Sequence, residues 1–316
     1  MNWYEARRRI WPLSRGPGDD GPAASPSLAA SSPFADARAR ELSIVPSTPA
    51  LSVCVASGKG GTGKSVVAAS LGTVLARRGR TLLVDADLGV GNAHILQDVA
   101  PARSFVDVVE GRASGREARV ACRSGLDLVA GGSGVSRMAG LSAHELHHVA
   151  QGIEAIEREY AHVVVDSAAG ISQQTVAFAA ASDLVLLVTT PDVTALTDAY
   201  AFFKVLSQRR PDAVTLLVVN RVQDAEEGLH VSERMRSVAH RFVGREPAYL
   251  GALPDDRSVL RSVNERRPAV LAEPGSAFAR AFEALGEGLV RELEARRPRG
   301  LGRALAAGSA HAAGAR

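Results

Sequence analysis

The sequence predicts an α/β fold, a doubly wound and mostly parallel sheet of about seven strands, and three observations support this prediction. From residue 51 onward, short apolar runs alternate with segments of helical periodicity. The first run leads directly into a glycine-rich segment with the spacing of a phosphate-binding loop. Two later runs lead into aspartates, at the edge where open parallel sheets bind their ligands.

The strands are predicted from apolar runs that are short, rich in β-branched residues and bounded by turn residues, as strands buried on both faces are. They are Leu51–Ala56, Thr81–Val84, Leu126–Val129, His162–Val165, Leu184–Thr189, Thr215–Val219 and Tyr249–Ala252. A last helix is predicted to open at Ser276, because apolar residues recur every three or four positions and would face the sheet. These residues are Phe278, Phe282, Leu285, Leu289 and Leu293.

Residues 57–65 read Ser-Gly-Lys-Gly-Gly-Thr-Gly-Lys-Ser and match the spacing G-x-x-x-x-G-K-[ST]. Glycines let backbone N–H groups point at a di- or triphosphate. Lys64 would place its ammonium on the β and γ oxygens, and Ser65 would offer its hydroxyl to Mg²⁺. The predicted nucleotide-binding residues of this loop are Gly58, Lys59, Gly60, Gly61, Thr62, Gly63, Lys64 and Ser65.

Lysine usage supports a phosphate site over a glycine-rich turn that binds nothing. The chain has 37 lysines and arginines, and the lysines among them are Lys59, Lys64 and Lys204. A phosphate cradle needs a slim point charge, which a planar guanidinium replaces poorly. The sequence therefore keeps lysine where nucleotide binding requires it.

Aspartates follow two of the predicted strands, beside the loop. Asp85 and Asp87 follow the strand that begins at Thr81, and Asp166 follows the strand that begins at His162. We expect Asp166 to hold Mg²⁺ through a water and Asp87 to orient an attacking water, with the N–H of Gly170 turned toward a γ-phosphate. The alternative is that each aspartate only caps the helix that follows it.

The loop resembles the deviant Walker A loop of the MinD/ParA class of ATPases. That resemblance implies ATP as substrate and Mg²⁺ as cofactor. It also implies a catalytic role for Lys59, which would reach the nucleotide of the second subunit in a face-to-face homodimer. Residues 85–89 with Asn92 look like the first switch of MinD-type ATPases. Residues 166–172 look like their second switch, with Ser167 and Ala168 where Thr-Gly or Thr-Pro is common.

Two further segments look like the adenine-binding segments of this class, residues 219–221 and 253–256. They imply nucleotide contacts from Asn220, Arg221, Pro254 and Asp255. Residues 189–200 are similar to the FlhG subfamily of flagellar-number regulators. The resemblance covers about residues 52–293 and implies an ATP-dependent dimerisation switch. Such a switch would be slow, activated by a partner, and would position or count a structure such as flagella at the membrane.

Composition divides the chain into three parts. Residues 1–48 are expected to form a disordered, basic tail and linker, residues 49–295 the ATPase domain, and residues 296–316 a basic, disordered tail. Residues 295–316 hold five arginines and no acids, and residues 1–20 hold four arginines against three acids. Since the whole chain has a formal charge of +3, the part between these ends carries −3.

The expected partners are a second copy of the chain in its ATP state, a protein such as the FlhF-type GTPase, and an anionic membrane. FlhG proteins usually open with Asp-Gln-Ala-x-x-Leu-Arg, which engages that GTPase, and residues 1–48 contain no match. Trp3, Tyr4, Ile10 and Trp11 surround the arginines Arg7–Arg9, so the N-terminal segment is a candidate lipid or partner anchor. An idle solvated tail is the alternative.

Three other functions agree less well with the sequence. A ParA-type ATPase that binds DNA nonspecifically would need a basic body, and the charge of −3 argues against one. An iron–sulfur carrier would need paired cysteines, but Cys54 lies inside a predicted strand and Cys122 lies elsewhere. Residues 144–148 read His-Glu-Leu-His-His, a formal zinc motif, but Ser142 and Glu145 predict a capping box instead.

The cellular location is predicted from cysteines and hydropathy. Two cysteines give no disulfide framework, and no run of 18 apolar residues is present. We therefore expect a cytoplasmic protein, in its membrane-bound state peripheral on the cytoplasmic face of the inner membrane.

Overall fold

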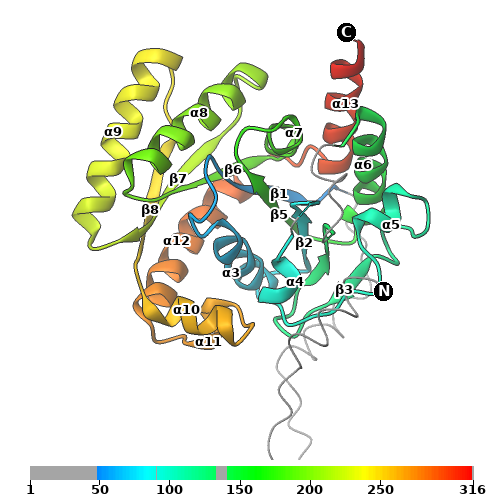
Figure 1. Ribbon diagram of the computed structural model, residues 1–316, viewed down its shortest axis with the longest axis horizontal. Coiled ribbons are helices and arrows are strands. Elements are labelled where there is room, and N and C mark those ends of the chain that lie inside the picture. The colour runs from blue at the N-terminus through cyan, green and yellow to red at the C-terminus, as the bar shows by residue number, and fades with distance from the viewer. Residues whose placement is uncertain (1–47, 90, 133–140, 315–316) are drawn as a thin grey trace, which may run out of the picture. The chain divides into compact units, whose positions relative to one another are not determined.

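The structure is a computed structural model that describes residues 48–89, 91–132 and 141–314 (Figure 1). These residues belong to one unit, Pro46–Arg316. Except for Thr48, the predicted N-terminal tail and its aromatic anchor lie outside the described residues.

The predicted α/β fold is confirmed, with eight strands in one sheet of order β3-β4-β2-β5-β1-β6-β7-β8. Neighbouring strands are parallel, apart from the antiparallel pair β3 and β4. The strands are β1 (Leu51–Ser57), β2 (Thr81–Ala86), β3 (Arg119–Ala121), β4 (Asp127–Val129), β5 (His162–Ala169), β6 (Leu184–Thr189), β7 (Thr215–Val222) and β8 (Ala248–Pro254).

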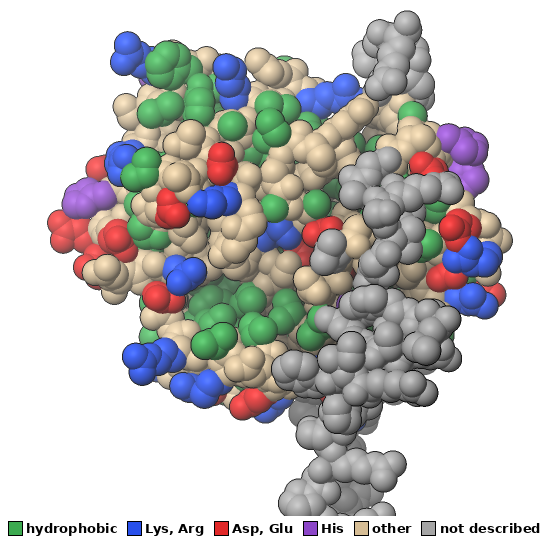
Figure 2. Space-filling model, viewed as in Figure 1, with side chains coloured by type: hydrophobic (Ala, Val, Ile, Leu, Met, Phe, Trp, Pro, Cys, Tyr) green, Lys and Arg blue, Asp and Glu red, His purple; other side chains and the backbone are tan. Residues whose placement is uncertain are grey.

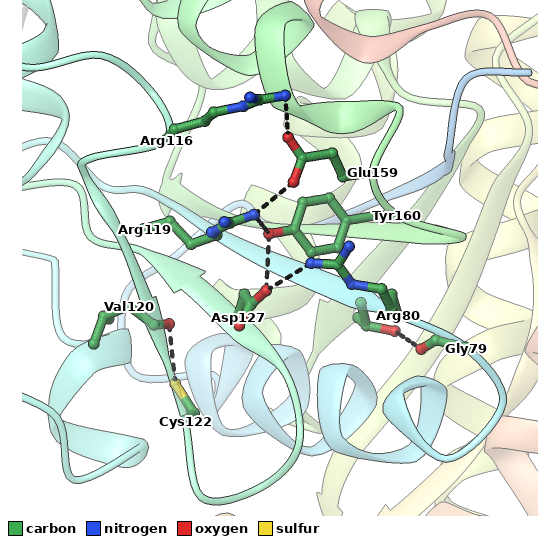
Figure 3. A network of polar contacts seen from close by, with 10 residues as sticks. Gly79, Arg80, Arg116, Arg119, Val120, Cys122, Asp127, Glu159 and Tyr160 are labelled. Atoms are coloured by element: carbon green, nitrogen blue, oxygen red, sulfur yellow. Dashed lines mark hydrogen bonds and ion pairs between the residues drawn. The ribbon is translucent and has the colours of Figure 1, made fainter. Parts of the chain in front are cut away.

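The sequence missed β3, because its two half-buried residues and one exposed residue, at the edge of the sheet, show no run of apolar residues. Polar contacts hold this strand in place at the amino end of the sheet (Figure 3). A guanidinium N–H of Arg119 donates to Glu159 Oε2 at 2.7 Å and to the Tyr160 hydroxyl at 3.0 Å. That hydroxyl donates in turn to Asp127 Oδ2 at 2.9 Å. Burial is the main reason that the pKa of Tyr160 is raised, so the phenol remains a donor.

Helices cover both faces of the sheet in three layers (Figure 1). One face packs against α3, α11 and α12, and the other against α6, α7, α8, α9 and α13. The helices are α3 (Lys64–Ala76), α4 (Ala93–Leu96), α5 (Phe105–Val109), α6 (Ala143–Glu157), α7 (Gln173–Ala181), α8 (Val193–Arg209), α9 (Ala225–Val243), α10 (Arg257–Asn264), α11 (Ala269–Ala272), α12 (Ala277–Glu294) and α13 (Leu301–Gly314).

Helix α12 is the predicted helix that opens at Ser276. The Ser276 side chain caps it by accepting from Ala279 N at 3.1 Å, and all five predicted apolar residues are buried. Within the described residues, no helix combines the length and the hydropathy needed to cross a bilayer.

The prediction of a disordered C-terminal tail is wrong for residues 301–314, which form α13 on the surface of α6 and α7. Leu301 and Leu305 are 0% and 1% exposed. At Gly302 the helices approach so closely that a Cβ would lie 2.5 Å from Glu154 N. The buried carboxylate of Glu157 accepts from Gly302 N at 3.2 Å. Glycine and alanine make this close contact possible but add little hydropathy, which is why the sequence pattern did not reveal the helix.

Candidate functional site

The phosphate-binding loop connects β1 to α3 at the carboxyl edge of the sheet. Gly61 and Gly63 have φ of 83° and 86°, in the left-handed region that favours glycine. Gly58 touches α8 so closely that a Cβ would lie 2.0 Å from the Asp198 carbonyl oxygen. Gly63 is the N-cap of α3 and provides no side-chain cap, so the first amides of this helix face the loop as an anion site would require.

The two residues assigned to phosphate and metal, Lys64 at the start of α3 and Asp166 on β5, lie against each other. Lys64 Nζ donates to Asp166 Oδ1 at 2.7 Å, and the two side chains are 9% and 2% exposed. Burial by itself would lower the pKa of Lys64, but the charge and hydrogen bond of Asp166, followed by Asp85 and Asp87, outweigh it and raise this pKa. Lys64 is therefore a fixed cation beside the carboxylates.

Asp85 and Asp166 lie opposite each other on β2 and β5. Both strands continue past their predicted ends. Each aspartate is in register with a neighbouring strand and therefore lies within its own strand, not after it. Asp85 is 0% exposed, and it accepts from Asp87 N at 3.2 Å and from Ala93 N at 3.1 Å. Burial, and then the charge of Asp166, raise the pKa of Asp85 well above its ordinary value. Asn92, the other residue assigned to this switch, is the N-cap of α4.

The second switch is tied to the loop. Gly170 has φ of 89°, and its N–H donates to the Ser57 carbonyl at 2.9 Å. This bond would have to break before that N–H could serve a γ-phosphate. The buried hydroxyl of Ser167 donates to the Val55 carbonyl at 3.0 Å. Serine, which stands here where Thr is common, is thus bonded to β1.

Lys59 points to the rim of the site. Its ammonium lies 3.5 Å from Asp192 Oδ2 and donates to the Thr194 hydroxyl, both at the start of α8. Asp192 is also the N-cap of α8 and accepts from Thr194 N at 2.7 Å. No role was predicted for Asp192 or Thr194 from the sequence. Their segment had been singled out by resemblance, but only the fold brings it next to Lys59.

The predicted base-binding residues gather beside the loop. Asn220 Nδ2 donates to the Thr62 carbonyl at 2.8 Å, so this amide braces the loop. Arg221 has a φ of 61°, and its Nε lies 3.5 Å from Asp255 Oδ1. Pro254 ends β8, and Asp255 N donates to the Val222 carbonyl at 2.9 Å. The structure thus brings Asn220, Arg221, Pro254 and Asp255 together at the ends of β7 and β8.

The alternative zinc motif lies at the start of α6, where the predicted capping box is confirmed. Glu145 Oε2 accepts from Ser142 N at 2.9 Å and from the Ser142 hydroxyl at 2.7 Å, so the glutamate stabilises its own helix. In the described part of the chain, no three His, Cys, Asp or Glu side chains gather as metal ligands.

The thiol of Cys54 is a poor ligand for a cluster, because burial keeps it protonated. Cys54 and Cys122 are both buried, and they form no disulfide with each other. Burial is the largest effect on Cys54 and raises its pKa to about 12.

Similarity to known proteins shows the family of this chain. The family model of the CobQ/CobB/MinD/ParA nucleotide binding domain matches residues 53–269. The antiactivator FleN of Pseudomonas aeruginosa is 34% identical over 240 residues, covering 76% of this chain and 86% of FleN. The flagellum site-determining protein YlxH of Helicobacter pylori is 33% identical over 244 residues, covering 77% of this chain and 82% of YlxH.

Among solved structures, the septum site-determining protein MinD of Pyrococcus horikoshii, complexed with Mg-ADP, has the same fold. The match has a TM-score of 0.64 at 24% identity and covers 78% of this chain and 98% of that protein. The chain therefore belongs to the CobQ/CobB/MinD/ParA nucleotide-binding family, within which it is a MinD-like ATPase.

Proposed function

We propose that this chain is an FlhG-type switch that dimerises with MgATP, separates after hydrolysis and thereby controls the number or position of flagella. The observation that carries the proposal is that one loop directs two lysines in different directions. Lys64 is buried against Asp166, whereas Lys59 is 41% exposed at the rim. A loop that serves only its own nucleotide needs only the inner lysine. The similarity to YlxH, a flagellum site-determining protein, supports the flagellar role.

The residues present suit MgATP. Ser65 and Asp166 offer oxygen donors at the inner end of the loop, as Mg²⁺ prefers. The buried hydroxyl of Thr62 has no hydrogen-bond partner in the described part of the chain, which suits a loop that contacts a ligand. When bound, Mg²⁺ would neutralise charge on the phosphates and stabilise the charge that develops during transfer.

The side chains divide the hydrolysis among them. Lys64 would leave Asp166 and bind the β and γ oxygens, which frees the Asp166 carboxylate to hold Mg²⁺ through a water. Asp87 would orient the attacking water, and Gly170 would turn its N–H toward the γ-phosphate. Lys59 would leave Asp192 and bind the nucleotide of the partner subunit. Asn220, Arg221, Pro254 and Asp255 would bind the base.

The ATP-bound dimer would be recognised by an FlhF-like GTPase or another protein, and by an anionic membrane, on the cytoplasmic face of the inner membrane. Two anchors on a dimer gain an effective concentration that raises avidity by about 10²–10⁴ over one anchor. Flotation with anionic vesicles tests this part. ATP-dependent binding that survives removal of residues 1–12 would exclude the N-terminal anchor.

A ParA-like role on DNA is the second candidate. Such a role needs a basic surface on the folded body. On the face drawn in Figure 2, the described lysines and arginines are interspersed with aspartates and glutamates. Together with the charge of −3 between the chain ends, this distribution favours the flagellar switch over DNA binding.

The proposed function is tested by combining light scattering with measurement of phosphate release. We expect a monomer with ADP and a dimer with MgATP. The dimer should return to monomer as phosphate is released. If the protein hydrolyses ATP but its mass does not change with ATP, the proposed dimerisation switch is wrong and the ATPase activity still stands.

A further inference from the structure

The first switch folds around a buried carboxylate that the mechanism above does not use. Asp85 is 0% exposed and lies beside the equally buried Asp166, whose carboxylate already takes the ammonium of Lys64. Burying a carboxylate next to another one is unfavourable for stability. The hydrogen bonds that its two oxygens accept offset part of this cost.

The two oxygens of Asp85 bind opposite ends of the switch. Oδ1 accepts from Asp87 N at 3.2 Å, and Oδ2 accepts from Ala93 N at 3.1 Å. Between these ends, the backbone of Gly91 passes directly over the carboxylate. A Cβ at that position would lie 2.4 Å from Oδ2 and 2.8 Å from Oδ1.

The start of the switch is held from two other sides. Gln174 Nε2, on α7 directly after the second switch, donates to the Ala86 carbonyl at 3.2 Å. Gly131 packs so closely that a Cβ there would lie 2.7 Å from the Asp87 carbonyl oxygen. The backbone at Asp87 is thus fixed by surrounding elements, and Asp85 is the group that connects it to the far end of the switch at Ala93.

We propose that Asp85 is a positioning residue for ATP hydrolysis: by binding both ends of the first switch, its carboxylate holds Asp87 where the attacking water is oriented. This inference rests on the proposed function, since the role of Asp87 belongs to that proposal. Asp85 itself touches neither nucleotide nor water in this scheme. Its removal should therefore slow turnover and leave nucleotide binding in place.

Two variants disturb this connection in different ways. Asp85→Asn keeps the shape but replaces one acceptor oxygen with an NH₂ group, so one of the two backbone bonds is lost. Gly91→Ala keeps the carboxylate and pushes it aside. Gly275→Ala is the matched control, because a Cβ there meets nothing within 4 Å and the glycine has no left-handed φ.

The experiment measures kcat and KM for MgATP, affinity for a fluorescent ATP analogue, melting temperature, and hydrogen exchange of the amides of Asp87 and Ala93. We expect both variants to lose about tenfold in kcat, the loss of about one hydrogen bond, with KM within about twofold of the parent. Exchange at the two amides should rise, and Gly275→Ala should match the parent.

Asp87→Ala, run in parallel, separates the two proposals. If Asp87→Ala keeps full turnover, the assigned role of Asp87 fails, and the proposed mechanism with it. If Asp87→Ala abolishes turnover but Asp85→Asn and Gly91→Ala both turn over at the parent rate, the positioning role of Asp85 is overturned. If both variants have a lower melting temperature and no longer bind the ATP analogue, the role of Asp85 is in folding and not in positioning Asp87.

Discussion

The ammonium of Lys64 and the carboxylate of Asp166 are 2.7 Å apart, and both are almost fully buried. Each group has another task in the proposed mechanism, Lys64 on the phosphates and Asp166 toward Mg²⁺. The pair must therefore separate when MgATP binds, and the nucleotide and the metal together must replace the attraction that is lost. The affinities for nucleotide and metal are coupled through this pair.

Asp166→Asn should weaken the Mg²⁺ dependence of nucleotide binding by about 10- to 100-fold, as loss of an outer ligand commonly does. Affinity for ADP without metal should hold or rise, because Lys64 no longer has a carboxylate to leave. Calorimetric titration of ADP with and without Mg²⁺ measures both. Glu233→Gln, on the exposed face of α9, is the charge-matched control. An equal loss of affinity with and without Mg²⁺ would contradict the assignment.

Lys59→Ala should bind MgATP with unchanged affinity and remain a monomer. The reason is that Lys59 lies at the rim and would act on the nucleotide of the other subunit, while Lys64 serves its own. Light scattering after gel filtration with ATP provides the measurement. Lys204→Ala, at the third lysine of the chain, should dimerise like the parent. An undiminished ATP-dependent dimer in Lys59→Ala would exclude the role in trans.

Asp192→Asn should lower the ATP concentration needed for dimerisation by about two- to fivefold, the range expected for an exposed ion pair. Asparagine still caps α8, so the change removes the charge that holds Lys59 in its own subunit. The dimer fraction is measured across an ATP titration at low salt, where exposed charges interact most strongly. A shift to higher ATP would mean that Asp192 supports the dimer rather than the monomer.

Gly302→Ala should lower the free energy of unfolding by about 1–3 kcal/mol, because α13 and α6 must move apart to admit a methyl group. Gly308→Ala lies in the same helix with nothing within 4 Å of its Cβ, and should hold or raise stability by up to about 1 kcal/mol. Urea unfolding of the two variants makes the comparison. Equal stability in both would show that α13 is not held by the contact at Gly302.

His162 should make the protein less stable as the pH falls below 6.5, the ordinary pKa of its imidazole. Burial lowers the pKa of His162, opposed by Glu294 and aided by Arg78. Between the lowered pKa and 6.5 the unfolded chain holds more protons, so unfolding becomes easier as pH falls through this range. The loss is at most about 1.4 kcal/mol per pH unit.

Urea unfolding at about pH 7.5 and about pH 5.5 tests this dependence, with His162→Gln as the variant that cannot titrate. The parent should lose more stability than His162→Gln between the two conditions. If the two proteins show the same difference, the imidazole does not contribute to the pH dependence.

The sequence alone predicted the phosphate loop, because the spacing of its residues follows from local chemistry, and it predicted the two switches and the base segments through their resemblance to the MinD/ParA class. The alternation of strands and helices followed from the periodicity of buried residues in the same local way. Only the tertiary structure decided how these pieces meet. Asp85 faces Asp166 because β2 and β5 are neighbours in the sheet, although β3 and β4 come between them in the chain. Lys59 meets Asp192 because the strands that precede them, β1 and β6, are also neighbours in the sheet.

Helix α13 shows the other limit of sequence analysis. Leu301 and Leu305 are too few to mark a buried helix by hydropathy, and the arginines around them indicate a solvated tail. The helix is held by a close approach at Gly302 and by the carboxylate of Glu157, a residue 145 positions earlier in the chain. Packing of small residues depends on the shape of the surface they meet, and that surface exists only after the chain has folded.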